Sequence, residues 1–307
     1  MASFHIGKQQ VHWSWNREDE PIVRAQSGDV VTVEVANASG GQITPQSTMK
    51  DVSQMDFSRV NPVSGPIYLQ NAEPGDAVIV EILAMDLDEW GWTANIPGFG
   101  LLADRFPDPH LRISRVTSKF AEILPGVRIP ICPFVGTVGL ALPELGDHPL
   151  VPPSRQGGNM DIRHITPGST LWLPVAVEGG LLSLGDTHAA QGDGEVCGTA
   201  IETSSTVTLR VHLKKSVNLA YPRLESSSVS ERQGPAWVTT GVGPSLWQAA
   251  YDAVASMIDW LEELTGLSRQ DAYLLTSVSG DLKISEIVDA PNWVVTMHVA
   301  KQITQGW

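Results

Sequence analysis

The 307-residue sequence has few cysteines, few charged residues and no long hydrophobic run, and each shortage excludes a class of protein. Cys132 and Cys197 are its only cysteines and could form at most one bridge, unlike a disulfide-stapled secreted scaffold. No apolar run approaches the ~18 residues of a membrane helix. The N-terminus also lacks the unbroken apolar stretch of a signal peptide. We therefore expect a cytoplasmic protein with free thiols.

Positive charge is also scarce. Lys and Arg number 20 against 34 Asp and Glu, which gives a formal net charge of −14. A surface this acidic repels phosphate backbones and anionic lipid, so we expect neither nucleic acid nor a membrane surface as a partner. Hydrophobic residues make up 42% of the chain, which is enough for a sizeable core and argues against disorder.

The first two thirds of the chain have the pattern of β-strands. Gly (28 residues) and Pro (21 residues) are numerous, which indicates many turns. Residues 30–35 (VVTVEV) and 77–83 (AVIVEIL) are rich in β-branched side chains, and each follows a Gly-Asp turn. This pattern predicts a β-rich body over residues 1–224.

The pattern changes near the polar residues 225–235, which we interpret as a boundary. A long helix is predicted between an N-cap at Ser245 and a stop at Gly266. A short second helix and two closing strands follow, so residues 236–307 are predicted to form a small α/β layer. The apolar face of the long helix comprises Leu246, Ala250, Val254, Met257, Ile258, Leu261 and Leu264.

One segment, residues 185–202 (GDTHAAQGDGEVCGTAIE), holds four carboxylates and a histidine among glycines. Residues i and i+2 of an extended chain share a face, so Asp186 and His188 point the same way and could bind one metal ion. Asp193 and Glu195 pair likewise. Four acids this close cannot all be ionised without a cation or shifted pKa values, so their density indicates a metal or a shared proton.

Ordinary turn chemistry could also explain these residues. Asp and Gly clusters cap turns, and a single histidine is more often a hydrogen-bonded core or surface residue. Residues 157–161 (GGNMD) leave the same two alternatives open. Asp161 could complete a carboxylate-rich metal shell, or it could only cap a turn.

Cys197 offers a second mechanism. Strands are predicted over residues 180–184 and 196–201, and the second would place Glu195 and Cys197 on one face. A Cys–Glu pair with a lysine can form a thiolate nucleophile. Nothing in the sequence places a lysine nearby, and a small buried cysteine is the commoner state on a strand.

Residues 185–202 closely resemble the signature of the acetamidase/formamidase family. Residues 61–76 (NPVSGPIYLQNAEPGD), 133–141 (PFVGTVGLA) and 157–163 (GGNMDIR) resemble three further blocks of that family. Residues 280–292 (GDLKISEIVDAPN) fit its closing strand. The blocks follow one another in order along almost the whole chain.

The resemblance implies hydrolysis of short linear amides to a carboxylate and ammonia. It implies a mainly β (α+β) fold of sandwich-like layers with the small C-terminal α/β layer. A homo-oligomer and a divalent ion such as zinc are also implied. One departure is Asn61, where a histidine would be a better metal ligand.

Roles for individual residues follow from this resemblance. A divalent ion would activate water for attack on the amide carbon. Backbone N–H groups at Gly192 and Gly194 would stabilise the oxyanion, and Asn159 would contact the substrate. The expected metal ligands are Asp186, His188 and Asp161.

The departing nitrogen needs a proton, because an unprotonated amide ion is a very poor leaving group. We predict that Glu195 carries this proton from water to nitrogen, with Asp193 and Glu202 orienting or tuning it. A bulge near the glycines would transfer the role to Glu202 or Asp193.

The alternative function is a non-enzymatic β-sandwich that binds a ligand or carbohydrate. Ten tryptophans support it, including Trp13, Trp15, Trp90 and Trp92 in loop-like stretches, where they could stack on sugars or fasten loops to the core. The carboxylate segment discriminates, because a sugar site needs aromatic and amide groups rather than four acids and a histidine.

Overall fold

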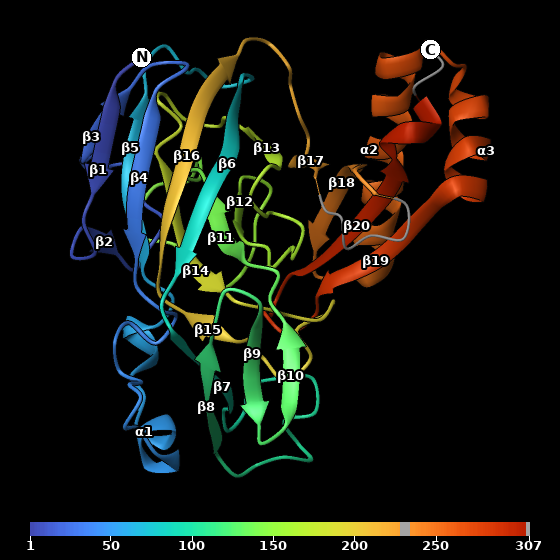
Figure 1. Ribbon diagram of the computed structural model, residues 1–307. Helices are drawn as coiled ribbons and strands as arrows, with labels where there is room; N and C mark the ends of the chain where they lie inside the picture. The colour runs from blue at the N-terminus through green and yellow to red at the C-terminus, as the bar shows by residue number, and fades with distance from the viewer. Residues whose placement is uncertain (228–233, 305–307) are drawn as a thin grey trace.

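The computed structural model describes residues 1–227 and 234–304, and two large β-sheets organise it (Figure 1). The nine-stranded sheet has the order β1 (Ser3–Ile6), β4 (Val30–Val35), β16 (Ser205–Lys214), β6 (Ala77–Leu87), β13 (Thr170–Pro174), β17 (Arg223–Ser226), β18 (Ala236–Gly243), β20 (Trp293–Ala300) and β19 (Gly280–Glu286).

The second sheet positions the candidate site. Its main path is β10 (Val127–Pro130), β9 (Phe120–Leu124), β8 (His110–Val116), β7 (Trp90–Asn95), β15 (Glu202–Thr203), β14 (Leu182–His188), β11 (Phe134–Gly139) and β12 (Gly157–Asn159). Off this path, β5 (Val63–Leu69) pairs with β14, β2 (Val11–His12) and β3 (Val23–Ala25). The helical elements of the body are α1 (Met49–Ser53) and the short 3-10 helix η1 (Phe57–Arg59).

The turns before β4 and β6 explain why these strands begin where they do. Gly28 and Gly75 have φ angles of 97° and 93°, which side chains other than glycine rarely adopt. In each turn the following aspartate, Asp29 or Asp76, accepts a backbone N–H from three residues earlier at 2.8 Å. The Gly-Asp pairs thus reverse the chain and leave β-branched residues to form the strands.

Side chains from both sheets form one continuous buried core. β4 alternates strictly between half-buried and buried residues, as a strand with one face on a core should. The predicted mainly β fold in layers is therefore confirmed. Members of this core include Val31, Val33, Val80, Ile82, Leu171, Val138, Leu182 and Leu184.

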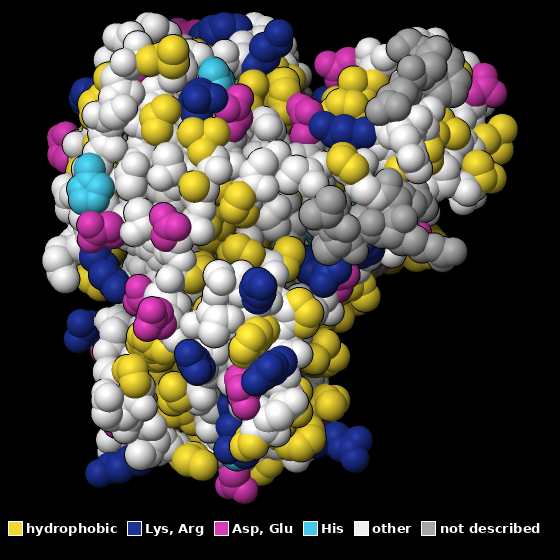
Figure 2. Space-filling view, viewed as in Figure 1, with side chains coloured by type: hydrophobic (Ala, Val, Ile, Leu, Met, Phe, Trp, Pro, Cys, Tyr) yellow, Lys and Arg dark blue, Asp and Glu magenta, His cyan; other side chains and the backbone are white. Residues whose placement is uncertain are grey.

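The C-terminal part forms a lobe of two helices, α2 (Leu246–Thr265) and α3 (Arg269–Ser279), on β18, β20 and β19 (Figures 1 and 2). The 3-10 helix η2 (Lys301–Thr304) follows β20. The predicted cap is confirmed, because the Ser245 hydroxyl accepts the Gln248 N–H at 3.3 Å. Gly266, with φ of 71°, ends the helix as predicted.

The buried face of α2 differs from the predicted one at its edges. Ala249 and Ala253 are fully buried, whereas Leu264, predicted to lie inside, is 36% exposed. The reason is a close approach of helix to strand: a Cβ on Gly241 of β18 would collide with the backbone of Ala249. Small residues therefore face the sheet.

The nine-stranded sheet continues from the body into this lobe. β17 pairs with β13 on one side and with β18 on the other. The division into residues 1–224 and 236–307 stays a prediction, and residues 228–233 of the predicted boundary lie outside the described part of the chain.

The prediction of a strand over residues 196–201 is wrong. This stretch forms turns, and only β15 is a strand in that region. Gly194, Glu195 and Gly198 have φ angles of 93°, 45° and 85°, which a strand cannot accommodate. The preceding strand, β14, also lies further along the chain than the predicted residues 180–184.

Candidate active site

β14 brings Asp186 and His188 together at the centre of the molecule. Every residue of this strand is buried, and its neighbours are β11, β15 and β5. His188 Nε2 lies 3.0 Å from Asp186 Oδ1 and 3.0 Å from Glu202 Oε2 on β15. The two residues that were expected to share a face thus converge.

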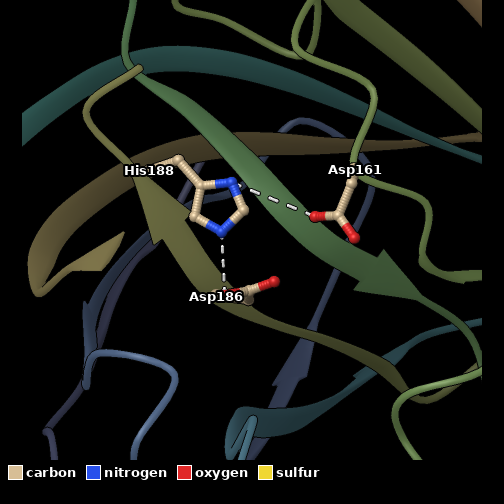
Figure 3. A group of neighbouring side chains, drawn as sticks. All are labelled: Asp161, Asp186 and His188. Atoms are coloured by element: carbon tan, nitrogen blue, oxygen red, sulfur yellow. Dashed lines mark hydrogen bonds and ion pairs between the residues drawn. The ribbon is translucent and has the colours of Figure 1, made fainter. Parts of the chain in front are cut away.

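Asp161 approaches the same histidine from another segment. It follows β12, and its Oδ1 lies 4.0 Å from His188 Nδ1 (Figure 3). Neither of its buried oxygens accepts a hydrogen bond from residues 1–227 or 234–304. Gly136 on β11 makes room for the cluster, because a Cβ there would press against the carboxylates of Asp161 and Asp186.

Two more acids complete the cluster. Glu195 is buried in the loop between β14 and β15, and its carboxylate forms a tight group with His188 and Glu202. Asp289, in the loop between β19 and β20, forms a second group with Asp161 and Glu195. Ligand atoms within each group lie within 4.8 Å of one another.

Sequence reasoning assigned no role to Asp289. It lies 87 residues beyond the end of the carboxylate segment at residue 202, so no local spacing could connect the two. The only sequence signal was its place in residues 280–292, the block that resembles the family's closing strand.

A chain of amides holds Asp289 in place. The Asn159 side chain donates to Asp289 Oδ2 at 2.6 Å, and Asn61 donates to Asn159 Oδ1 at 2.8 Å. The Thr137 hydroxyl also donates to Asn159 Oδ1. Asn61, a poor metal ligand by its chemistry, thus has a role in positioning Asn159.

His188 and the carboxylates next to it stabilise each other's charged forms. Burial disfavours the imidazolium, but the carboxylates of Asp186 and Glu202 outweigh it and raise the pKa of His188 well above its usual value. Burial also opposes ionisation of Asp186, yet His188 lowers the pKa of that carboxyl. Burial raises the pKa of Glu202 to about 7.

The other three acids hold protons more tightly than usual. Burial is the main cause that raises the pKa values of Asp161, Glu195 and Asp289, and the negative charges of neighbouring carboxylates add to it. The cluster therefore shares protons among buried carboxylates, as its density in the sequence indicated.

This set of donors fits a divalent metal ion. One imidazole and several carboxylates lie within ligand reach of each other, and nitrogen and oxygen donors of this kind suit zinc and related ions. The unpartnered oxygens of Asp161 support the same interpretation, since a buried carboxylate without a hydrogen bond is costly.

Four acids of the cluster line one part of a small pocket of about 60 Å³. A water molecule needs roughly 10–15 Å³ on this measure, so the pocket suits a molecule of only a few heavy atoms. Its polar lining residues include Asn159, Asp186, Glu195, Glu202 and Asp289, and its apolar lining residues include Met55, Phe57, Trp92, Ile96, Phe99 and Val151.

Five predicted site residues do not line this pocket: His188 and Asp161 lie in the cluster behind its polar lining, and Gly192, Asp193 and Gly194 lie elsewhere. Asp193 Oδ1 lies 3.2 Å from Arg163 Nε at the surface. Gly192 lines a second pocket, of about 430 Å³, together with Asp193. The Gly194 N–H donates to the Ser285 carbonyl at 2.9 Å. Contrary to our expectation, this N–H is therefore not free to stabilise an oxyanion.

Glu195 and Thr199 line both pockets. Cys197 lines only the second pocket, where its Sγ lies 3.3 Å from the Thr199 carbonyl. Both Cys132 and Cys197 are free thiols.

Two of the loop-region tryptophans belong to the protein interior. Trp15 and Trp92 are buried, and the Trp92 indole donates to the Asn37 side chain at 3.2 Å. Trp92 lies on strand β7 rather than in a loop, and neither buried ring can stack on a sugar, which removes much of the support for a sugar-stacking surface. Among the described residues, no helix is long and apolar enough to cross a membrane.

A histidine among buried carboxylates, beside a small pocket in a two-sheet β fold, defines a candidate hydrolytic enzyme. Comparison with known proteins agrees. A sequence model of the Acetamidase/Formamidase family matches residues 2–145 and 147–305. The chain therefore belongs to the acetamidase/formamidase family.

Individual relatives resemble it along most of its length. It is 28% identical to a formamidase of Methylophilus methylotrophus, over 96% of this chain and 89% of that protein. It is 30% identical to an acetamidase of Mycolicibacterium smegmatis, over 66% of each. The solved structure of an acetamidase from Bacillus halodurans matches with a TM-score of 0.90 and 32% identity, over 98% of this chain and 99% of that one.

Proposed function

We propose that this protein is an amidase that hydrolyses short linear amides to a carboxylate and ammonia. The observation that carries the proposal is the buried His188 and carboxylate cluster beside a pocket for a few heavy atoms. Relatives named formamidase and acetamidase support the same substrate class. The non-enzymatic binding protein is not favoured.

Asp186, His188 and Asp161 would hold a divalent ion, with zinc as the first candidate. When bound, such an ion polarises the amide carbonyl and lowers the pKa of water towards neutrality. The support is the convergence of the three side chains from β14 and from the segment after β12.

Glu195 would deliver the proton that the leaving nitrogen requires. Its carboxyl lines the pocket, and burial raises its pKa, so it holds a proton more tightly than an exposed glutamate does. Glu202 would orient His188. Asp193 would act through its ion pair with Arg163, which anchors the loop that carries Glu195.

Asn159 is the proposed substrate-binding amide. It lines the pocket, and its own side chain is fixed by Asn61 and Asp289 on either side. A fixed amide can orient the substrate carbonyl or nitrogen without a large loss of side-chain entropy.

Assembly and location complete the proposal. A homo-oligomer follows from the family resemblance, and size-exclusion chromatography with light scattering would test it. A reducing cytoplasmic compartment is supported by the two free cysteines.

The deciding experiment measures metal content and ammonia release from untagged protein on a panel of short amides. His188→Ala should lose both the bound metal and turnover, because one of about three protein ligands is removed. His110→Ala, at an exposed histidine on β8, is the control and should keep both. Full activity in a metal-free wild-type chain would refute the metal and direct attention to Cys197.

A further inference from the structure

The side chain of Gln191 joins two parts of the site and has no assigned role. Its Oε1 lies 2.9 Å from His188 Nδ1, and its Nε2 lies 2.9 Å from the backbone carbonyl oxygen of Asp161. Gln191 therefore links the end of β14 to the segment after β12.

The backbone carbonyl of Asp161 decides which way the Gln191 amide points. A carbonyl oxygen can only accept, so the group that faces it must be the amide –NH2. The amide oxygen must then face His188. An oxygen facing Nδ1 at 2.9 Å requires a proton on that nitrogen, so Nδ1 is the donor.

This leaves Nε2 as the histidine nitrogen that faces the acids. Nε2 lies 3.0 Å from both Asp186 Oδ1 and Glu202 Oε2. Nδ1, the nitrogen nearer Asp161, is occupied by its bond to Gln191. A metal ion can bind only a ring nitrogen that carries no proton.

The backbone of the two residues before Gln191 is held by hydrogen bonds to two other segments. The Ala189 N–H donates to the Ile201 carbonyl at 2.9 Å, and the Ile201 N–H donates to the Ala190 carbonyl at 3.0 Å. The Cys132 N–H donates to the Ala189 carbonyl at 2.9 Å. The side chain of Gln191 thus lies on a rigid support between His188 and the second pocket.

We infer that Gln191 is a positioning residue, which keeps the proton of His188 on Nδ1 and presents Nε2 to the metal ion. This rests on the proposed function for the presence of a metal. Hydrogen bonds from a ligating histidine to a neighbouring acceptor fix its tautomer and orientation, and their loss typically lowers metal affinity about 10–100-fold.

The first test reads the ring nitrogens directly. The protein, labelled with 15N at histidine and loaded with 113Cd, is examined by NMR, and His188→Ala assigns the His188 signals. We expect coupling between cadmium and Nε2 and a retained proton on Nδ1. Coupling to Nδ1 would overturn the inference, and so would a chain that binds no cadmium.

The second test uses variants. Gln191→Met removes the acceptor at similar volume, and cadmium affinity measured by calorimetry should fall about 10–100-fold. Gln191→Glu restores an acceptor for Nδ1–H and should recover affinity to within about threefold of wild type. Gln70→Met, which removes a surface amide bonded to Gln26, is the matched control and should bind cadmium as the wild type does.

Unchanged affinity in Gln191→Met, or no recovery in Gln191→Glu, would overturn the positioning role. If Gln191→Met fails to fold, the wild-type spectrum still decides which ring nitrogen of His188 binds cadmium. The outcomes also separate from those of the proposed function: absence of ammonia release refutes the amidase but leaves the ring spectrum unchanged. If the protein releases ammonia but cadmium binds Nδ1, the amidase proposal stands and the role of Gln191 is refuted.

Discussion

Asn159 on β12 donates a 2.6 Å hydrogen bond to Asp289, which lies 130 residues further along the chain. Both side chains are buried, and both line the small pocket. This single bond connects the second sheet to the loop between β19 and β20, so the C-terminal lobe contributes directly to the site.

Replacing Asn159 with alanine should therefore destabilise the protein. Asp289 would lose a donor, and Asn61 and the Thr137 hydroxyl would each lose the Asn159 oxygen as an acceptor, all in a buried setting. Leaving buried partners unsatisfied costs about 1–3 kcal/mol for each group. We expect the free energy of unfolding in urea to fall by about 2–4 kcal/mol.

The chain supplies a control with the same chemistry. Asn16 donates to Asp147 at 3.0 Å, but this pair is exposed. Asn16→Ala should change the free energy of unfolding by less than about 1 kcal/mol, because water replaces the lost partner. Equal losses for the two variants would contradict a special role for the buried pair.

Glu195→Gln tests proton delivery. Glutamine keeps the size of the side chain but cannot transfer a proton, so amide turnover should fall by about 10²-fold or more with metal content unchanged. The loss should be smaller for an ester of the same acyl group, since an alkoxide leaves more easily than an unprotonated amine.

The matched control is Glu144→Gln, at an exposed glutamate, which should hydrolyse both substrates normally. If Glu195→Gln lowered amide and ester turnover equally, Glu195 would instead hold the metal ion or position its loop. A drop in bound metal would give the same answer.

Leu261 and Leu264 on α2 test the packing of the C-terminal lobe. Leu261 is 0% exposed and Leu264 is 36% exposed. Leu261→Ala should lower the free energy of unfolding by about 2–5 kcal/mol through lost burial and a cavity. Leu264→Ala should cost less than about 1 kcal/mol, and equal midpoint shifts in denaturant would mean that the two positions are buried alike.

Glu286 should make stability depend on pH. Burial raises its pKa in the folded chain to about 7, from an ordinary value of 4.5. The folded state thus binds this proton more tightly than the unfolded state, so its contribution is fully present below pH 4.5. That contribution is lost as pH rises through about 7, and it amounts to about 3 kcal/mol.

The comparison is with Glu286→Gln, which keeps an oxygen for the Val288 and Asp289 N–H groups. With chelator present, the free energy of unfolding of the wild type should decline relative to this variant between pH 4.5 and 7. Parallel pH profiles for the two proteins would show that Glu286 ionises normally in the fold.

Local sequence patterns correctly predicted the features that depend on neighbouring residues, such as strand starts and helix ends. The Gly-Asp turns led into β4 and β6, and Ser245 and Gly266 bounded α2, because these residues act on their immediate neighbours. The i, i+2 spacing of Asp186 and His188 likewise brought them together on β14.

The remainder of the site depends on long-range pairing that no local pattern records. Asp289 and Asn61 reach the cluster through sheet topology. The strand expected at residues 196–201 failed because Gly198, together with Gly194 and Glu195 just before it, has a positive φ angle. The β-branched and apolar residues there favoured a strand, but the turn geometry determined the structure.

The sheet that runs through β17 into the C-terminal lobe has a consequence for anyone who builds hybrids of related chains. A junction near residue 225 would look safe from sequence, yet it would separate Asn159 from Asp289 and β13 from β18. A hybrid should therefore take the amide at position 159 and the carboxylate at position 289 from the same parent. A shortened gene product ending before residue 289 would lack both a strand of the sheet and an acid of the pocket.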